Sequence, residues 1–490
     1  MLAPSTRRMT RQLLPVFLLA LSSQTLHAGV ISFDATDQAN SAFYTLLNDV
    51  PVGGWAQLSS NSFSDVYTPN HLRARGVDGT QSRTNPERVI AAWSSMAWDP
   101  NRNDLIFWGG GHANYTGNEV YRWSSATLSW ERASLPSQIQ LQNPSLSAAR
   151  YETVDGWENS PISTHTYDST EFLPIADRLS VIGGPAYNSG GPFLKDDLQT
   201  VTGPYFWDPD KADPNKVGGI TGSGVNPATE GGEMWQNRDN LPQQFNWKTL
   251  NNATAWTEEN GKDVLFFHVP QFKPMKYTIH DVNDPSQDTW EEVGERYDQN
   301  VRLFNKQGSG AYDSTRNWFV RTNASTLLFW DLNTFSNAIS LDLNSLIAGS
   351  PITDLHGMDY DPIIDKYLLW GGNSSVWYLT PPDNKFGTWD LEEIVGIGDA
   401  PIGQWAGRGI LGKWKYLADY GVFLGVNGFD VGGGDIWAYK PVGHDLLVYQ
   451  APALGAVPLA DALWHLLIGF SIMRLIGIRK ARSRSGLRAA

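Results

Sequence analysis

The sequence predicts an all-β fold, a β-propeller with six blades, from its composition and from a hairpin motif that recurs along it. The chain of 490 residues contains 47 glycines, 28 prolines and 21 tryptophans, and only 18% of its residues are charged. This composition is typical of many short strands joined by tight turns. A motif repeated along the chain then favours a propeller, because every blade repeats the same unit.

Each repeat is predicted to be two apolar strands joined by a polar turn. It starts at an aromatic residue, usually followed by Asp, and a Gly-Gly pair or its substitute comes some eleven to sixteen residues later, as in "WDPNRNDLIFWGG". Three copies keep the glycines, and three keep only the spacing. The aromatic anchors of the six copies are Trp98, Tyr167, Trp256, Tyr312, Tyr360 and Tyr416.

Further strands are predicted outside each hairpin, for example at 118–123 and 375–379. Four strands in about 50 residues make one blade of a propeller. The first two separations between anchors are longer than the others, so a seventh, degenerate blade stays open. A two-sheet sandwich would also consist of short strands, but it would not repeat one hairpin motif six times.

Glycine pairs and the aromatic residues after them mark the three stronger copies: Gly109, Gly110, Tyr121 and Trp130, then Gly183, Gly184 and Trp207, then Gly371, Gly372, Tyr378 and Trp389. These residues resemble the repeats of kelch-type propellers, in the galactose-oxidase-like superfamily, and the resemblance covers roughly residues 50–450. It implies that an N-terminal strand, "GGWAQL" (53–58), closes the last blade beside "GDIWAYK" (434–440). Galactose oxidases need a cysteine cross-linked to a copper-ligating tyrosine. The chain has no cysteine, which argues against that copper-radical cofactor.

Residues 1–28 predict a secretory signal peptide. Arg7, Arg8 and Arg11 precede the short apolar run "LLPVFLLAL", and Ala28 offers a small residue for cleavage. The apolar run is too short for a membrane span, and a buried N-terminal helix is the alternative. We therefore expect an exported protein.

Residues 457–490 predict one membrane helix, at about 460–478, followed by a basic tail that places the C-terminus in the cytoplasm. The segment starts with Val457, Pro458, Leu459, Ala460, Ala462 and Trp464. With the arginine-rich end, these residues resemble the PEP-CTERM sorting segment, although the usual Pro-Glu-Pro is absent. The resemblance implies a protein exported from a bacterial cell and an exosortase-type partner that removes the tail, which leaves the protein at the cell surface or secreted. A plain C-terminal membrane anchor is the alternative.

Residues 29–456 form the predicted propeller domain between these ends. The whole chain has a net charge of −14 and both ends are basic, so the processed body would be still more acidic. That charge argues against nucleic acid as a partner, and it repels polyanionic sugars unless basic residues cluster locally. Without disulfides, stability must come from a large core. We expect a monomer.

One face of the predicted propeller carries most of the polar candidates. In a blade of four antiparallel strands, the loop from the second to the third strand and the connection to the next blade emerge on the same face. The long segments 136–163, 184–203 and 214–247 belong to that face, and such loops are usually functional or disordered. The candidate residues expected there are His112, Asn114, Tyr115, Asn118, Glu119, His165, Asn252, Lys306, His356, Trp405 and Arg408.

Three functions stay open for this face. The first is binding of an extracellular glycan or other polymer, with Trp157, Trp235 and Trp405 stacking on sugar rings. PEP-CTERM-like proteins are associated with bacteria that make exopolysaccharide, so the resemblance favours this partner. The second is a carbohydrate-active enzyme, and the third is a protein-interaction scaffold.

The enzyme hypothesis covers a polysaccharide lyase and a sugar mutarotase. In the lyase, His112 or His165 would remove a proton, Tyr115 would be the acid, and Arg408 would neutralise a carboxylate. The structural alternative is that each histidine hydrogen-bonds a neighbouring loop.

No cofactor and no metal site is expected. Two groups of acidic residues have the oxygen spacing of a calcium loop but lack the glycine and final glutamate of an EF-hand, so both are interpreted as blade turns. The histidines lack metal-ligand spacing in the sequence. The two acidic groups are Asp208, Asp210 and Asp213, and Asp281, Asp284 and Asp288.

Overall fold

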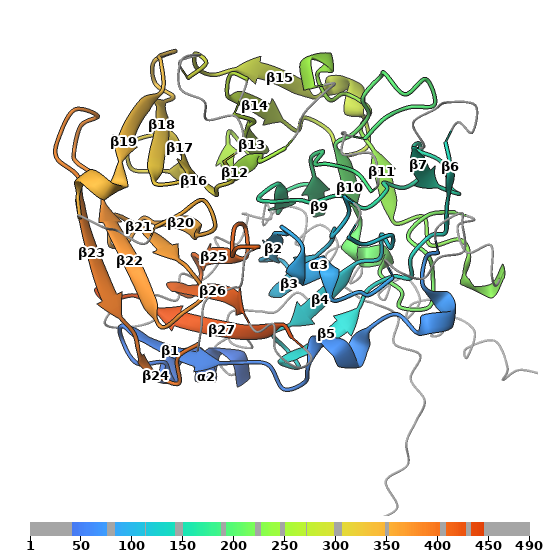
Figure 1. Cartoon of the computed structure of the whole chain (residues 1–490), viewed down its shortest axis with the longest axis horizontal. Coiled ribbons are helices and arrows are strands. Elements are labelled where there is room, and N and C mark those ends of the chain that lie inside the picture. The colour runs from blue at the N-terminus through green and yellow to red at the C-terminus, as the bar shows by residue number, and fades with distance from the viewer. Residues whose placement is uncertain are drawn as a thin grey trace, which may run out of the picture.

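Six sheets surround a central axis, with the first strand of each sheet innermost (Figure 1). This computed structural model describes residues 42–444, apart from 76–83, 113, 143–149, 188–192, 221–226, 246–249, 271, 298–305, 348–351, 402–407 and 428–432. The all-β class and the six-bladed propeller are therefore confirmed for the described residues. The long separation after the first blade holds a small hairpin, β6 (Ile139–Leu141) with β7 (Tyr151–Thr153), instead of a seventh blade.

Within each blade, neighbouring strands are antiparallel and follow chain order from the axis outward. The first three blades are β2 (Met96–Asp99), β3 (Asp104–Phe107), β4 (Tyr121–Ser124), β5 (Ser129–Arg132); β8 (Thr170–Leu173), β9 (Arg178–Val181), β10 (Tyr205–Trp207), β11 (Trp235–Asn237); and β12 (Ala253–Glu259), β13 (Lys262–His268), β14 (Met275–Thr278), β15 (Thr289–Glu292). The last three are β16 (Gly310–Asp313), β17 (Trp318–Asn323), β18 (Thr326–Asp331), β19 (Ile339–Asp342); β20 (Gly357–Asp361), β21 (Lys366–Trp370), β22 (Ser375–Thr380), β23 (Asp390–Val395); and β25 (Trp414–Leu417), β26 (Val422–Asn427), β27 (Asp435–Lys440).

The sixth blade is completed by the N-terminal strand, as the resemblance to kelch-type propellers led us to expect. Strand β1 (Gly54–Gln57) pairs antiparallel with β27, so that Trp55 lies opposite Tyr439. A two-residue strand, β24 (Ile397–Gly398), then adds to β1 in parallel. The N-terminal segment therefore closes the ring between the first and last blades, and this pairing leaves little free edge.

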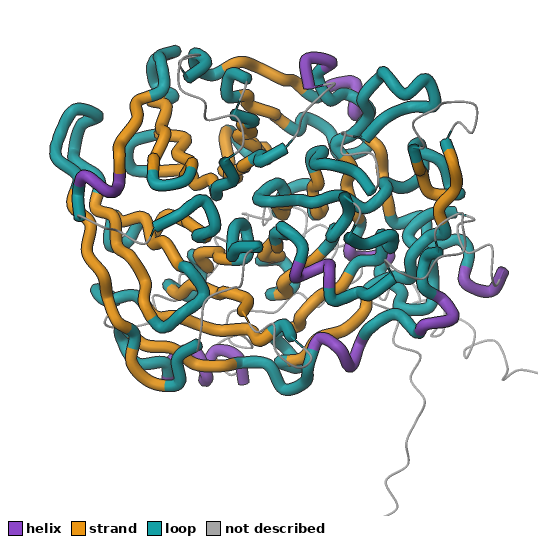
Figure 2. Tube along the Cα trace, viewed as in Figure 1, coloured by secondary structure: helices purple, strands orange, loops and turns teal. Residues whose placement is uncertain are grey.

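Helices are short and lie in the connections (Figure 2). The α-helices are α2 (Ala42–Asp49) and α3 (Arg88–Ala91), and the 3₁₀-helices are η1 (Phe63–Val66), η2 (Asn70–Leu72), η3 (Pro209–Lys211), η4 (Pro227–Thr229), η5 (Gln243–Phe245), η6 (Pro285–Gln287) and η7 (Leu343–Ser345). Asp208 and Asp284, from the two acidic groups, are the N-caps of η3 and η6. Among the described residues, no group of three or more His, Cys, Asp or Glu side chains could hold a metal ion.

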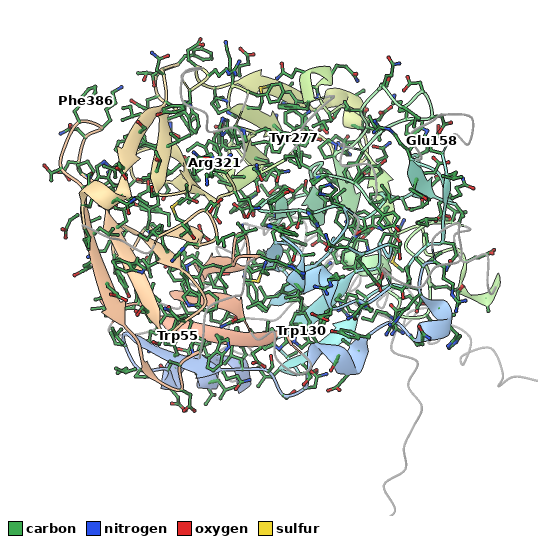
Figure 3. The ribbon with its side chains drawn as sticks, in the orientation of Figure 1. Trp55, Trp130, Glu158, Tyr277, Arg321 and Phe386 are labelled. Atoms are coloured by element: carbon green, nitrogen blue, oxygen red, sulfur yellow. The ribbon has the colours of Figure 1, made fainter. Side chains whose placement is uncertain are left out.

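Apolar side chains fill the space between neighbouring blades. Trp55, Trp370 and Trp414, from the fifth and sixth blades, pack with ring centroids 5.0–5.7 Å apart. Trp130, on the outermost strand of the first blade, donates its indole N–H to the carbonyl of Gly434 at 2.8 Å. Trp55 and Trp130 are both buried, and Figure 3 labels them on the side of the ring where the first and last blades meet. These contacts supply the large core that a protein without disulfides needs.

The anchor predicted for the second blade is wrong by five residues. Phe172, not Tyr167, lies in β8 opposite Leu179, in the place that Trp98 takes opposite Leu105 in the first blade. Tyr167 precedes the strand in a left-handed conformation, with φ of +51°. The pair Tyr167–Asp168 imitates the aromatic–Asp motif, but Asp168 accepts a hydrogen bond from the backbone of Gly310 across the axis.

Recurrent Asp–Arg pairs hold the loops between first and second strands, which we call the lower face. Asp313 accepts the backbone N–H of Arg316 at 2.8 Å, and the Arg316 guanidinium reaches the next blade to bind both oxygens of Asp365 at 2.6 Å. In the first blade, Arg102 binds Asp177 of the second blade in the same way at 2.7 Å. Arg102 and Arg316 therefore each have carboxylate partners in their own blade and in the next one.

Within the described residues, no helix has the length and apolar character that would let it cross a membrane. The predicted signal peptide at 1–28 and the segment 457–490 lie outside the described residues. Export and membrane insertion therefore stay predictions from the sequence.

Candidate functional site

The opposite face, which we call the upper face, consists of the loops from second to third strands and the connections between blades. The loop after β3 lies directly against the connection between the first two blades. A side chain at Gly111 would place its Cβ 2.1 Å from the carbonyl oxygen of Ser163, so only glycine permits this approach. The Ser163 hydroxyl donates to the carbonyl of Gly109 at 2.9 Å. The glycines thus bring His112 beside His165.

Three aromatic rings surround the imidazole of His165. Ring centroids lie 5.2 Å away for His112, 4.9 Å for Trp93 and 5.9 Å for Tyr167. The amide Nδ2 of Asn114 donates to Nε2 of His165 at 2.9 Å, which assigns the proton of the neutral ring to Nδ1. With Arg408, these five residues form what we call the His165 cluster.

The backbone that carries Trp93 and Tyr167 is a recurrent feature of the fold. Both residues have positive φ, +47° and +51°, and each lies five residues before the anchor of its blade. Asn251 and Leu411 occupy the same place in the third and sixth blades, with φ of +58° and +52°. The unusual conformation therefore belongs to blade entry, and the distinctive feature of the cluster is that two of these positions carry aromatic rings.

The two histidines of the cluster are neutral at neutral pH. Burial lowers the pKa of His112, and burial together with the neighbouring His112 lowers the pKa of His165 to about 3. Burial raises the pKa of Tyr167, so its hydroxyl stays protonated. The site thus offers two imidazoles, a phenol and an amide, all uncharged.

Arg408 contributes the positive charge of the cluster. Its guanidinium carbon lies 5.8 Å from the centroid of the Trp93 ring, on the side chain that also packs against His165. Its Nη1 is buried without a hydrogen-bond partner, and no carboxylate in the described part of the chain forms an ion pair with it. A buried donor without a partner is costly, so the site favours a ligand that brings an acceptor.

Three residues predicted near His112 are buried in other contacts. The Tyr115 hydroxyl donates to Glu119, which also accepts from Tyr121 at 2.9 Å and from Thr68 at 2.7 Å. Asn118 donates to the carbonyl of Pro161 at 2.9 Å. Burial raises the pKa of Tyr115 well above its ordinary value. The Tyr115 hydroxyl therefore faces Glu119, and the phenol beside the histidines is Tyr167.

Other predicted rim residues do not contact the His165 cluster in the described structure. Asn252 is fully buried and donates to the carbonyl of Ile182 at 3.1 Å, and Lys306 is exposed. His356 accepts from the backbone of Thr353 at 3.2 Å, and burial lowers its pKa to about 4. The structure thus brings together His112, Asn114, His165 and Arg408 from the predicted set.

The three tryptophans predicted to stack on sugars have different positions. Trp235 lies in strand β11 and only 8% of it is exposed, so the prediction of a loop aromatic is wrong for this residue. Trp157 is half-buried in the connection between the first two blades. Trp405 lies outside the described residues.

The prediction from the sequence did not include Trp93, because it was based on strand anchors, and it included Tyr167 only as an anchor. The repeat does hold a signal, since Trp93 precedes Trp98 by the same interval that separates Tyr167 from Phe172. Comparison with known proteins adds no assignment, because no protein family and no curated protein matches the sequence.

Proposed function

We propose that the upper face binds an extracellular glycan that carries carboxylate groups. The guanidinium of Arg408 supports this most directly, because it lies over Trp93 with a buried Nη1 that has no partner in the described structure. A carboxylate would accept from that group, and the neutral imidazoles and amide beside it match sugar hydroxyls. The acidic body of the protein would repel an acidic glycan, and the Arg408 guanidinium supplies a local positive charge that offsets this repulsion.

The location predicted from the sequence, outside the cell, is consistent with an extracellular ligand. The sequence resembles an exported kelch-type propeller with a PEP-CTERM-like C-terminal segment, and that resemblance is associated with bacteria that make exopolysaccharide. We propose that the propeller is displayed at the cell surface or secreted, with processing of residues 457–490 by an exosortase-type enzyme.

A second candidate function, glycan cleavage by β-elimination, has its own support in His112. This imidazole is half-buried, uncharged and 5.2 Å from His165. In the reaction, His112 takes the proton next to the carboxylate while Arg408 neutralises the carboxylate. The bond to the leaving oxygen breaks, a carbon–carbon double bond forms, and the Tyr167 hydroxyl gives its proton to that oxygen.

Binding is tested with an oligosaccharide of alternating glucuronate and N-acetylglucosamine, measured by calorimetry at low salt. We expect the Arg408→Ala variant to lose about ten- to a hundred-fold in affinity, because a charged hydrogen-bond partner is removed. Lys366→Ala, which removes a lower-face lysine paired with Glu392, is the matched control and should bind like wild type. Equal affinity of wild type and Arg408→Ala would refute the proposal.

The same samples separate binding from cleavage. An elimination product contains a conjugated double bond that absorbs ultraviolet light. If the protein is a lyase, absorbance rises with wild type and not with His112→Ala, while His112→Ala still binds the oligosaccharide. If no absorbance develops with wild type, the cleavage hypothesis is rejected and the binding proposal stands.

A further inference from the structure

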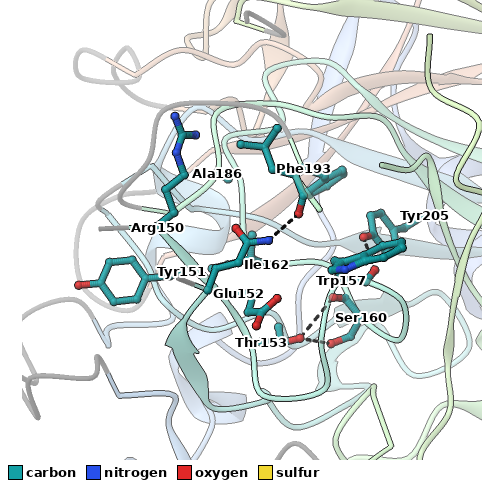
Figure 4. Close-up of a pocket in the computed structure, with 12 residues that line it drawn as sticks. Arg150, Tyr151, Glu152, Thr153, Trp157, Ser160, Ile162, Ala186, Phe193 and Tyr205 are labelled. Atoms are coloured by element: carbon teal, nitrogen blue, oxygen red, sulfur yellow. Dashed lines mark hydrogen bonds between the residues drawn. The ribbon is translucent and has the colours of Figure 1, made fainter. Parts of the chain in front are cut away.

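A narrow crevice opens on the upper face between the β6–β7 hairpin and the second blade (Figure 4). Its walls come from the described parts of the long segments 136–163 and 184–203 and from Tyr205 in β10. We call it the Trp157 crevice, and its lining includes Glu152, Trp157, Ser160, Ile162, Phe193 and Tyr205.

Aromatic side chains form one wall of this crevice. Phe193 and Tyr205 pack edge to face with centroids 4.8 Å apart, and the Tyr205 hydroxyl donates to the carbonyl of Trp157 at 2.5 Å. The ammonium of Lys195 lies 5.0 Å from the Trp157 ring. These contacts hold the rings in place, which lowers the entropic cost of stacking a ligand on them.

A carboxylate with one free oxygen lies in the same crevice. Oε1 of Glu152 accepts from Gln140 at 2.9 Å, whereas Oε2 is buried and has no hydrogen-bond partner among the described residues. Figure 4 shows this carboxylate directed into the crevice, toward the side of Trp157 and Ser160. A buried acceptor of this kind is satisfied by a donor from a ligand or a water molecule.

The crevice and the His165 cluster share one pair of chain segments. The backbone N–H of Tyr187 donates to the carbonyl of Ser163 at 2.8 Å, and the backbone N–H of His165 donates to the carbonyl of Pro185 at 3.2 Å. Ile162 lines the crevice and lies three residues before His165, a span of about 10 Å in extended chain. The Trp157 crevice and the His165 cluster are therefore neighbouring sites on the upper face.

We propose that the Trp157 crevice is a second subsite, which takes an uncharged, hydroxyl-bearing sugar of the same glycan whose carboxylated sugar binds at Arg408. The inference rests on the proposed function and adds to it that the ligand is an extended chain of unlike units. The enclosed volume of about 20 Å³ has room for one water molecule, so a hydroxyl group enters while the ring stacks across the mouth. Arg150 also lines the crevice, but Figure 4 shows its guanidinium directed away from Glu152 and Trp157. Beside Trp157, the Glu152 carboxylate would therefore repel a second carboxylated unit.

The test compares a disaccharide and a decasaccharide of the alternating glucuronate–N-acetylglucosamine chain. We expect Trp157→Ala to lower the affinity for the decasaccharide about ten-fold and to leave the affinity for the disaccharide unchanged, because only the longer chain reaches both subsites. Phe386→Ala is the matched control, since Phe386 is 83% exposed at the rim, has Lys385 5.7 Å from its ring and should not contact the ligand (Figure 3).

Glu152→Gln provides a readout that a purely structural role would not change. Removing the negative charge should raise the affinity for oligogalacturonate, in which every ring is carboxylated, because the repulsion at the second subsite disappears. The inference is overturned if Trp157→Ala leaves the decasaccharide affinity unchanged, if it weakens both lengths equally, or if Glu152→Gln does not change the preference between the two chains. If wild type binds neither length, or if Arg408→Ala binds both normally, the proposed function itself fails.

Discussion

The lower face and the upper face of this propeller use arginine differently. On the lower face, Arg316 binds Asp313 in its own blade and Asp365 in the next, and the guanidinium is almost completely covered. On the upper face, Arg408 lies over the Trp93 ring with no carboxylate partner among the described residues. The first arrangement satisfies every charge within the fold, and the second leaves a cation to be satisfied by something else.

The pKa shifts of buried acids and histidines show the same difference between the two faces. Burial raises the pKa of Asp99, on the lower face, to about 6, and the Arg102 guanidinium opposes that rise. On the upper face, burial lowers the pKa of His165 to about 3, and no described carboxylate counters it. The type of a residue therefore does not show whether it stabilises the fold or belongs to a binding site. In these examples, the presence or absence of an oppositely charged partner within the protein does distinguish the two roles.

The largest effect is expected at the paired arginine. Replacing Arg316 by alanine leaves Asp313, which is fully buried, without its cation, and it removes the link to Asp365 in the fifth blade. We expect the free energy of unfolding to fall by about 3 kcal/mol, because the Asp313 carboxylate would stay buried without a positive charge to compensate for its lost hydration. Equilibrium denaturation with urea measures this change.

Two comparisons sharpen that result. Lys366→Ala removes the more exposed pair with Glu392 and should cost at most about 0.5 kcal/mol. Arg316→Ala should bind the oligosaccharide as tightly as wild type at a temperature where both are folded. A large loss of affinity in Arg316→Ala, with stability unchanged, would reverse the assignment of roles to the two faces.

A smaller loss of stability is expected for Tyr115, which the sequence placed among the catalytic candidates. Its hydroxyl donates to the buried Glu119 carboxyl, so Tyr115→Phe should lower the free energy of unfolding by about 2 kcal/mol. Ligand affinity and any ultraviolet-absorbing product should be unchanged, whereas Tyr167→Phe should change them without a similar loss of stability. If Tyr115→Phe changed product formation, Tyr115 would have to be counted among the residues of the candidate site.

Much of the fold was predictable because propeller blades repeat. The spacing of aromatic anchors and glycines predicted six blades, and the resemblance to kelch-type propellers implied that "GGWAQL" would close the last blade, where β1 pairs with β27. The error at Tyr167 has a physical cause, since an aromatic–Asp pair at a blade entry looks the same in sequence as one inside a strand. What distinguishes them is the contact of Asp168 with Gly310 across the axis, which no local pattern contains.

The candidate site was predictable only in part. Topology placed His112, His165 and Arg408 on one face, but it could not show that Tyr115 turns toward Glu119 or that Trp93 stands between His165 and Arg408. Those outcomes depend on side-chain packing between segments far apart in sequence. The Trp157 crevice is of the same kind, because its two walls come from loops of different blades.

The smallest effect tests whether His165 is held neutral by the fold. Its pKa is about 3 in the folded state and about 6.5 in an unfolded chain, so between these values the unfolded state binds one more proton and stability falls as the pH is lowered. His165→Gln cannot bind that proton. Between pH 6 and pH 5, wild type should therefore lose about 1.2 kcal/mol more stability than the variant, while above pH 7.5 the difference between the two should not vary with pH. His268 and His356 titrate equally in both proteins and cancel in the comparison.

Parallel stability curves of wild type and His165→Gln from pH 7.5 to pH 4 would contradict this prediction. They would show that His165 has the same pKa in the folded and unfolded states, and the inference that the His165 imidazole is kept neutral by the fold would be wrong.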